Sequence, residues 1–210
     1  RSKLDNAKWR SNWDWALTAG SAIPPIIFGV AFGNLLLGVP FHFDELLRIY
    51  YTGSFWALLN PFALLVGVFS LLMFINQGAC YLQMKTEAPL RQRAEAVSLI
   101  SATLAAVLFI AAGVWLASAG MGYKVTSVID SNAINSAVTK TVEVSSGAWL
   151  SNYESYPLLW IFPLLGVAAF LVSALCSKMA KGWQAFVASS LAIVGVIMTC
   201  GCLLYTSPSP

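Results

Sequence analysis

The chain has 210 residues, of which 58% are hydrophobic and only 10% are charged, and its net charge is +3. A soluble domain carries about 25% charged residues, so this composition excludes a water-soluble fold and indicates an integral membrane protein. The basic residues are also too few for a nucleic-acid-binding surface.

Five stretches of the chain lack Asp, Glu, Lys and Arg, and each can hold one membrane-spanning helix, which needs about 20 apolar residues. We expect helices rather than strands, because a backbone in lipid must satisfy its own hydrogen bonds. The sequence therefore predicts an all-α, polytopic bundle with about five transmembrane helices in one domain, residues 1–203. The predicted spans are 16–38, 57–84, 97–119, 157–176 and 183–203.

The segment before the first span combines charged and aromatic side chains. Arg10 and Asp14 lie four residues apart, close to Trp13. Opposite charges at this spacing predict a local ion pair on a helix. The functional alternative is that these residues contact another subunit or a lipid headgroup.

The first span contains Pro24-Pro25, which predicts a kink or the start of a new turn. Gly29 and Gly33 follow at a four-residue spacing, so they lie on one helix face, where another helix can approach closely. Asn34 lies near the end of this span.

The second span lies within the longest uncharged interval, Ile49 to Met84, which contains 36 residues. Its polar side chains are neutral: Asn60 precedes the long apolar run, and Asn76 and Gln77 lie near the basic end. We expect these residues and Asn34 to form hydrogen bonds with neighbouring helices. Holding a quinone or a chain of water molecules is the alternative role.

The sequence offers few ligands for a cofactor or a metal. The single histidine, His42, lies between Phe41 and Phe43 in a predicted turn, outside the spans where an axial haem ligand is needed. The four cysteines lie inside or at the ends of spans, and Cys200 and Cys202 lack further metal ligands nearby. We therefore predict no catalytic residue, no haem and no metal ion on this chain.

Lysine and arginine are distributed unevenly between the two sides of the predicted bundle. If the five spans alternate in direction, nine of these residues lie on one side and three on the other. Cytoplasmic loops carry the excess of basic residues, so the N-terminal segment, the loop 85–96 and the turn 177–182 are predicted to face the cytoplasm. The segments 39–56 and 120–156 are then outside, and the latter has room for a short surface helix.

Several short motifs follow one another in a fixed order. They are Arg1-Ser2-Lys3, Trp9-Arg10, Trp13-Asp14, Gly20-Ser21, Pro24-Pro25, Gly29-Val30-Ala31-Phe32-Gly33-Asn34, Gly38-Val39-Pro40-Phe41, Tyr50-Tyr51-Thr52-Gly53, Leu58-Leu59-Asn60-Pro61-Phe62, Gln77-Gly78-Ala79, Tyr81-Leu82-Gln83-Met84 and Gly147-Ala148-Trp149-Leu150. In this order and spacing they resemble subunit II of the cytochrome bd-type ubiquinol oxidases, over residues 1 to about 200.

The resemblance implies a subunit of a terminal respiratory oxidase in the bacterial cytoplasmic (inner) membrane. The family complex oxidises quinol, reduces dioxygen to water and contributes to the proton gradient. Its haems and its quinol-oxidation loop belong to the partner, subunit I, which subunit II scaffolds without binding haem. A structural quinone or lipid and a small accessory subunit are further implied partners. The related cyanide-insensitive oxidases leave the haem set of the partner open.

The resemblance also implies that helices precede Arg1, and that the family's proton-entry aspartate lies among them. We therefore expect the chain to start within a longer protein. The tail 204–210 breaks off the last span without a charged anchor, and we interpret it as a foreign sequence. Two alternatives stay open: a fragment of a secondary transporter, suggested by the prolines of the first span and the Asn76-Gln77 pair, and a purely structural membrane protein.

Overall fold

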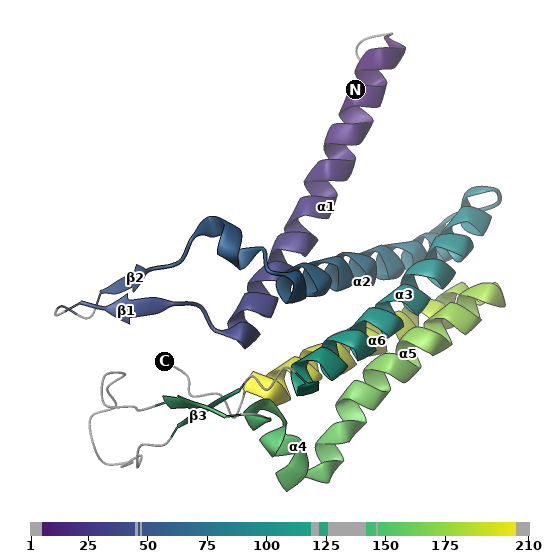
Figure 1. Cartoon of the computed structure of the whole chain (residues 1–210). Coiled ribbons are helices and arrows are strands. Elements are labelled where there is room, and N and C mark those ends of the chain that lie inside the picture. Colours follow the sequence, from purple (N-terminus) through teal and green to yellow (C-terminus); the bar gives the residue numbers. More distant parts are fainter. Residues whose placement is uncertain are drawn as a thin grey trace. The chain divides into compact units, whose positions relative to one another are not determined.

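The computed structural model describes residues 6–44, 46, 48–118, 122–125, 142–145 and 147–204. Figure 1 shows long helices and short strands. In chain order the elements are α1 (Ala7–Leu37), β1 (Phe41–Phe43), β2 (Ile49–Tyr51), η1 (Phe55–Leu58), α2 (Pro61–Lys85), α3 (Leu90–Ser118), β3 (Tyr123–Val125), β4 (Val142–Val144), η3 (Ala148–Leu150), α4 (Ser151–Ser155), η4 (Pro157–Trp160), α5 (Ile161–Lys178) and α6 (Gly182–Leu204). The predicted tail 204–210 lies outside the described residues apart from Leu204.

Five helices in the described part of the chain are long and apolar enough to cross a membrane. They are α1, α2, α3, the stretch Pro157–Lys178 that contains η4 and α5, and α6. The prediction of an all-α, polytopic membrane bundle is therefore confirmed.

The described residues also form two antiparallel strand pairs, which the sequence did not predict. Strand β1 pairs with β2, where His42 lies opposite Tyr50, and β3 pairs with β4, where Lys124 lies opposite Glu143. The rings of His42 and Tyr50 are stacked, with centroids 5.7 Å apart. Strands of three residues are too short to show an alternating pattern of polar and apolar residues.

The first helix is longer than the predicted span. Asn6 caps its N-terminus, because the Asn6 side chain accepts a hydrogen bond of 3.0 Å from the backbone N–H of Lys8. The helix also continues through Pro24 and Pro25, so it does not start anew there, and the kink that was the other expectation stays a prediction. Membrane helices tolerate proline, because neighbouring groups satisfy the backbone groups that it frees.

The chain divides into two compact units, residues 1–74 and residues 75–210. The first unit contains α1, the β1–β2 hairpin, η1 and the first half of α2. Its interior is formed by a few apolar side chains from both helices, among them Val30, Leu36, Phe62 and Phe69.

The second unit contains the second half of α2 together with α3, α5 and α6, and α5 packs against both α3 and α6 (Figure 1). Its buried apolar residues are mostly small, as in Ala102, Ala105 and Ala192. A Cβ atom added to Gly195 would lie 2.6 Å from the backbone nitrogen of Gly166. Small residues thus let the backbones of α5 and α6 approach closely.

Candidate functional site

Asn34 and Asn60 form a hydrogen-bonded pair inside the first unit. The Asn34 Nδ2 group donates to the carbonyl oxygen of Leu58 at 2.7 Å and to that of Val30 at 2.9 Å. Asn60 Nδ2 donates to Asn34 Oδ1 at 2.9 Å. Asn60 Oδ1 accepts from the backbone N–H of Ala63 at 2.8 Å, as expected of a residue that caps the start of α2. We call Asn34 and Asn60 the asparagine pair.

Gly29 and Gly33 lie on the face of α1 that meets α2. A Cβ atom at Gly29 would lie 2.5 Å from the carbonyl oxygen of Val66 and 2.7 Å from the Cα atom of Gly67. A Cβ atom at Gly33 would lie 2.7 Å from the Cα atom of Ala63. Both glycines are buried, so this contact requires residues without a side chain.

A second group of polar side chains is buried in the second unit. We call it the serine–amide cluster, and its members are Asn76, Cys80 and Gln83 of α2, Ser98 of α3, and Ser173 and Ser177 of α5. Each is at most 2% exposed. Cysteine, serine and amide side chains carry no charge in their ordinary forms, so the cluster combines complete burial with neutrality.

Asn76 links three helices within this cluster. Ser98 donates to Asn76 Oδ1 at 2.9 Å, and Asn76 Nδ2 donates to the Ser173 hydroxyl at 3.4 Å. The Ser173 hydroxyl in turn donates to the carbonyl oxygen of Ala185 in α6 at 3.3 Å. The Cys80 sulfur lies 3.2 Å from the hydroxyl oxygen of Ser98. One set of hydrogen bonds thus joins α2, α3, α5 and α6.

Gln83 closes the other end of the cluster. The hydroxyl oxygens of Ser98 and Ser177 are 2.8 Å apart, and Gln83 Nε2 donates to Ser177 at 3.1 Å and to the carbonyl oxygen of Ala94 at 3.4 Å. Gly182 lies directly against Gln83, since a Cβ atom there would be 3.2 Å from Gln83 Cβ. The start of α6 is therefore packed on this amide.

Gln77 makes separate contacts with α6. Ser189 donates a short hydrogen bond to Gln77 Oε1, and Gln77 Nε2 donates to the Ser190 hydroxyl at 3.0 Å. Asn76 and Gln77, both predicted to bond to neighbouring helices, thus have different partners. Successive side chains on a helix lie about 100° apart, so the two amides point in different directions.

Arg10, Trp13 and Asp14, the candidate contact residues at the start of α1, are separate in the sequence from the asparagine pair and from the serine–amide cluster. Trp13 is 44% exposed and packs edge-to-face against Trp9, with ring centroids 5.7 Å apart. Thr18 donates to the carbonyl oxygen of Asp14 at 2.8 Å. The Arg10–Asp14 ion pair stays a prediction.

The sequence interpretation missed Gln83, Ser98, Ser173 and Ser177. A signal was present in the spacing: Asn76, Cys80 and Gln83 follow one another at four and three residues, which puts them on one face of α2. Ser173 and Ser177 share the same four-residue spacing. Neutral polar residues repeated on one face of an apolar helix indicate a polar contact with another helix.

The described residues offer little for redox or metal chemistry. Among them, no three His, Cys, Asp or Glu side chains lie close enough together to hold a metal ion. His42 is exposed on its hairpin, so it does not face the interior of a helical bundle. The asparagine pair and the serine–amide cluster are each joined by hydrogen bonds between neutral groups.

Comparison with known proteins matches residues 1–209 to the family described as cytochrome bd terminal oxidase subunit II. Over 210 residues the chain is 51% identical to a probable cytochrome oxidase subunit 2 of Haemophilus influenzae and 46% identical to the cytochrome bd-I ubiquinol oxidase subunit 2 of Escherichia coli K12. Both alignments cover 100% of this chain and 55% of the relative. The cytochrome bd ubiquinol oxidase subunit 2 of Bacillus subtilis is 32% identical over 114 residues, which are 53% of this chain and 32% of that relative. The chain thus spans about half the length of the first two relatives.

Proposed function

Because the chain belongs to the family of cytochrome bd terminal oxidase subunit II, we propose that it is part of a haem-free membrane subunit of a bd-type quinol:dioxygen oxidoreductase. In this role the subunit scaffolds the haem-bearing subunit I of the aerobic respiratory chain. Quinol oxidation and oxygen reduction take place on the partner, so the chain itself carries no catalytic residue. The transporter alternative finds no support in these comparisons.

The serine–amide cluster is the observation that supports a scaffolding role most directly. Its side chains are neutral, fully buried and hydrogen-bonded to one another across four helices. Hydrogen bonds between membrane helices fix their register at a modest gain of about 1 kcal/mol each. Such a rigid bundle is a suitable surface for docking a second subunit.

Two possible axial ligands among the described residues, His42 and Met198, are not enclosed in the helical units. A haem held within a bundle requires axial ligands that face its interior, and His42 lies on an exposed hairpin instead. Met198 is 47% exposed on α6, which is also unlike an enclosed axial ligand. These positions support assigning the haems to subunit I.

The proposed topology follows from one end of the second unit. The helix ends and turns there carry five basic residues, Lys85, Arg91, Arg93, Lys178 and Lys181. By the positive-inside rule this end faces the cytoplasm, and if successive spans alternate in direction, the N-terminal segment with Lys8 and Arg10 faces the cytoplasm as well. Arg10, Trp13 and Asp14 are then positioned to contact a partner subunit or lipid headgroups at the cytoplasmic surface, and the membrane is the bacterial inner membrane.

Expression of the full-length protein with and without subunit I tests the proposal. We expect the tagged protein to co-purify with subunit I and to show haem absorption only when subunit I is present. The same absorption from the protein expressed alone would overturn the haem-free assignment. Failure of the two chains to co-purify would overturn the scaffolding role. A small accessory subunit and a structural quinone or lipid would appear in the same preparation by mass spectrometry.

A further inference from the structure

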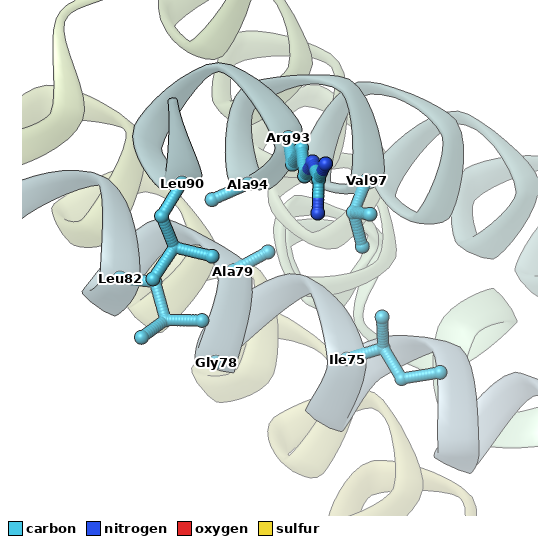
Figure 2. Close-up of a pocket in the computed structure, with 8 residues that line it drawn as sticks. All are labelled: Ile75, Gly78, Ala79, Leu82, Leu90, Arg93, Ala94 and Val97. Carbon is cyan, nitrogen blue, oxygen red and sulfur yellow. The ribbon is translucent and has the colours of Figure 1, made fainter. Parts of the chain in front are cut away.

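An apolar groove lies between α2 and α3 at the basic end of the second unit (Figure 2). Residues between Ile75 and Leu82 form one wall, and residues between Leu90 and Val97 form the other. Its volume is about 360 Å³, at the lower end of the roughly 300–1,000 Å³ of ligand pockets. Leu90 and Val97 are 48% and 44% exposed, so the groove opens to the surroundings of the helices.

Gly78 makes the groove possible. It is exposed, and a Cβ atom added to it would meet nothing within 4 Å. This differs from Gly29 and Gly33, where the missing side chain lets a neighbouring helix approach. At Gly78 the missing side chain instead leaves a hollow in the surface of α2.

Arg93 is the charged residue of the groove wall (Figure 2). Its guanidinium has no hydrogen bond or ion pair with the described residues, although Arg91, two residues earlier, is engaged twice. Arg91 Nε donates to Glu95 Oε1 at 3.0 Å, and its Nη2 donates to the carbonyl oxygen of Ala180. The Glu95 carboxylate is thus occupied by Arg91, and the charge of Arg93 is available to an external anion.

We propose that this groove binds an anionic phospholipid, with one acyl chain along Gly78 and the headgroup phosphate on Arg93. The site combines an apolar wall of about two helical turns on each side with the guanidinium of Arg93 in the first turn of α3, and this matches the chemistry of such a lipid. A quinone has two carbonyl oxygens on opposite sides of its ring. Arg93 can donate to one of them, but the other lining residues, which are glycine, alanine, leucine, isoleucine and valine, have no side-chain donor for the second. In the proposed topology the lipid belongs to the cytoplasmic leaflet, so this assignment rests on the proposed function.

Lipid retention by the purified full-length oxidase complex tests the proposal. The complex is exchanged into detergent with dioleoylphosphatidylglycerol or dioleoylphosphatidylcholine, and bound lipid is measured by native mass spectrometry. Arg93→Gln should lower phosphatidylglycerol retention roughly five-fold, because a basic residue near an anionic lipid contributes about this factor. Retention of the zwitterionic lipid should not change. Gly78→Leu should lower the retention of both lipids, because the added side chain fills the groove.

Two control variants match these changes. Lys178→Gln removes a basic residue at the same end of the unit. Gly113→Leu adds the same side chain on α3, outside the groove, at a position where a Cβ atom also meets nothing within 4 Å. Neither should alter retention of phosphatidylglycerol. Equal losses in Arg93→Gln and Lys178→Gln would overturn the proposal, because the charge would then act without a defined site.

Other occupants of the groove would also overturn it. If Gly78→Leu lost bound quinone while its retention of phosphatidylglycerol stayed unchanged, the groove would be a quinone site. If a cysteine introduced by Gly78→Cys cross-linked to another subunit, the groove would be a protein interface. Haem absorption of each preparation reports complex formation separately. A preparation that retains lipid but no haem-bearing partner contradicts the proposed function and leaves the lipid site standing.

Discussion

The side-chain amide of Asn60 donates a hydrogen bond of 2.9 Å to the side-chain oxygen of Asn34, and so joins the end of α1 to the start of α2. Both amides are used further, since Asn34 also donates to the carbonyl oxygen of Leu58 and Asn60 caps the N–H of Ala63. The pair therefore fixes the chain where it enters α2 after the β1–β2 hairpin. In an apolar environment each of these groups would otherwise be left without a partner.

Replacing Asn34 by leucine should destabilise the first unit. Leucine has about the same size as asparagine, but it lacks the amide donors of Asn34 and the oxygen that accepts from Asn60. The unfolding free energy should therefore fall by about 1–3 kcal/mol. Thermal unfolding of the full-length protein in detergent measures this as a lower midpoint. Thr18→Val is the matched control, because the Thr18 hydroxyl is exposed and bonds only to its own helix. Equal midpoints for the two variants would contradict a structural role of the pair.

Gly29→Ala should weaken the contact between α1 and α2. The new methyl group would lie 2.5 Å from the carbonyl oxygen of Val66, and backbone atoms cannot move aside as a flexible side chain can. Overpacking of this kind costs about 1–3 kcal/mol. Gly20→Ala is the control on the same helix, since a Cβ atom there meets nothing within 4 Å. We expect a lower unfolding midpoint only for Gly29→Ala, and a similar loss in both variants would argue against the close approach.

Sequence reasoning reached the class of fold because hydrophobic length and charge placement are properties of single segments. It did not reach the β1–β2 hairpin, because Phe41 to Phe43 and Ile49 to Tyr51 are too short for periodicity. It also placed the start of α1 too late. The span was located by its lack of charge, whereas the helix begins earlier, at the cap supplied by Asn6.

The polar contacts between helices show a second limit of prediction from the sequence. The sequence marked Asn34 and Asn60 as neutral polar residues in or beside spans, and the structure joins them directly. It marked Asn76 but not Ser98, its donor in α3. Serine is common in apolar helices, so its importance depends on which helix lies opposite, and that is a property of tertiary packing rather than of any one segment.

Ser98→Ala should destabilise the second unit through the serine–amide cluster. Without the hydroxyl, Asn76 Oδ1 loses a donor at 2.9 Å and Ser177 loses a partner at 2.8 Å. Leaving such groups unsatisfied in a buried site costs about 1–3 kcal/mol. Ser101→Ala is the matched control, because Ser101 is also buried on α3 but bonds only to carbonyl oxygens of its own helix. The unfolding midpoint should fall more for Ser98→Ala, and the reverse order would contradict an interhelical role of the cluster.

Tyr153→Phe should change how stability depends on alkaline pH. Burial, with a smaller contribution from the nearby thiols of Cys202 and Cys200, raises the pKa of Tyr153 from 10.0 to about 12. The phenol also donates a hydrogen bond to the carbonyl oxygen of Thr199, which favours its protonated form. Between these two pH values the unfolded chain releases the phenol proton and the folded chain keeps it. The unfolded state then binds fewer protons, so stability falls as the pH rises through this window.

The phenylalanine variant lacks this proton, so its unfolding midpoint should fall less steeply between pH 10 and 12 than that of the unsubstituted protein. At neutral pH the variant should be slightly less stable, because the hydrogen bond to the carbonyl oxygen of Thr199 is lost. Tyr156→Phe is the control, since Tyr156 is 66% exposed, and it should follow the unsubstituted protein over the whole range. Parallel alkaline profiles for the protein and Tyr153→Phe would show that the phenol of Tyr153 titrates alike in the folded and unfolded states, which contradicts its burial against α6.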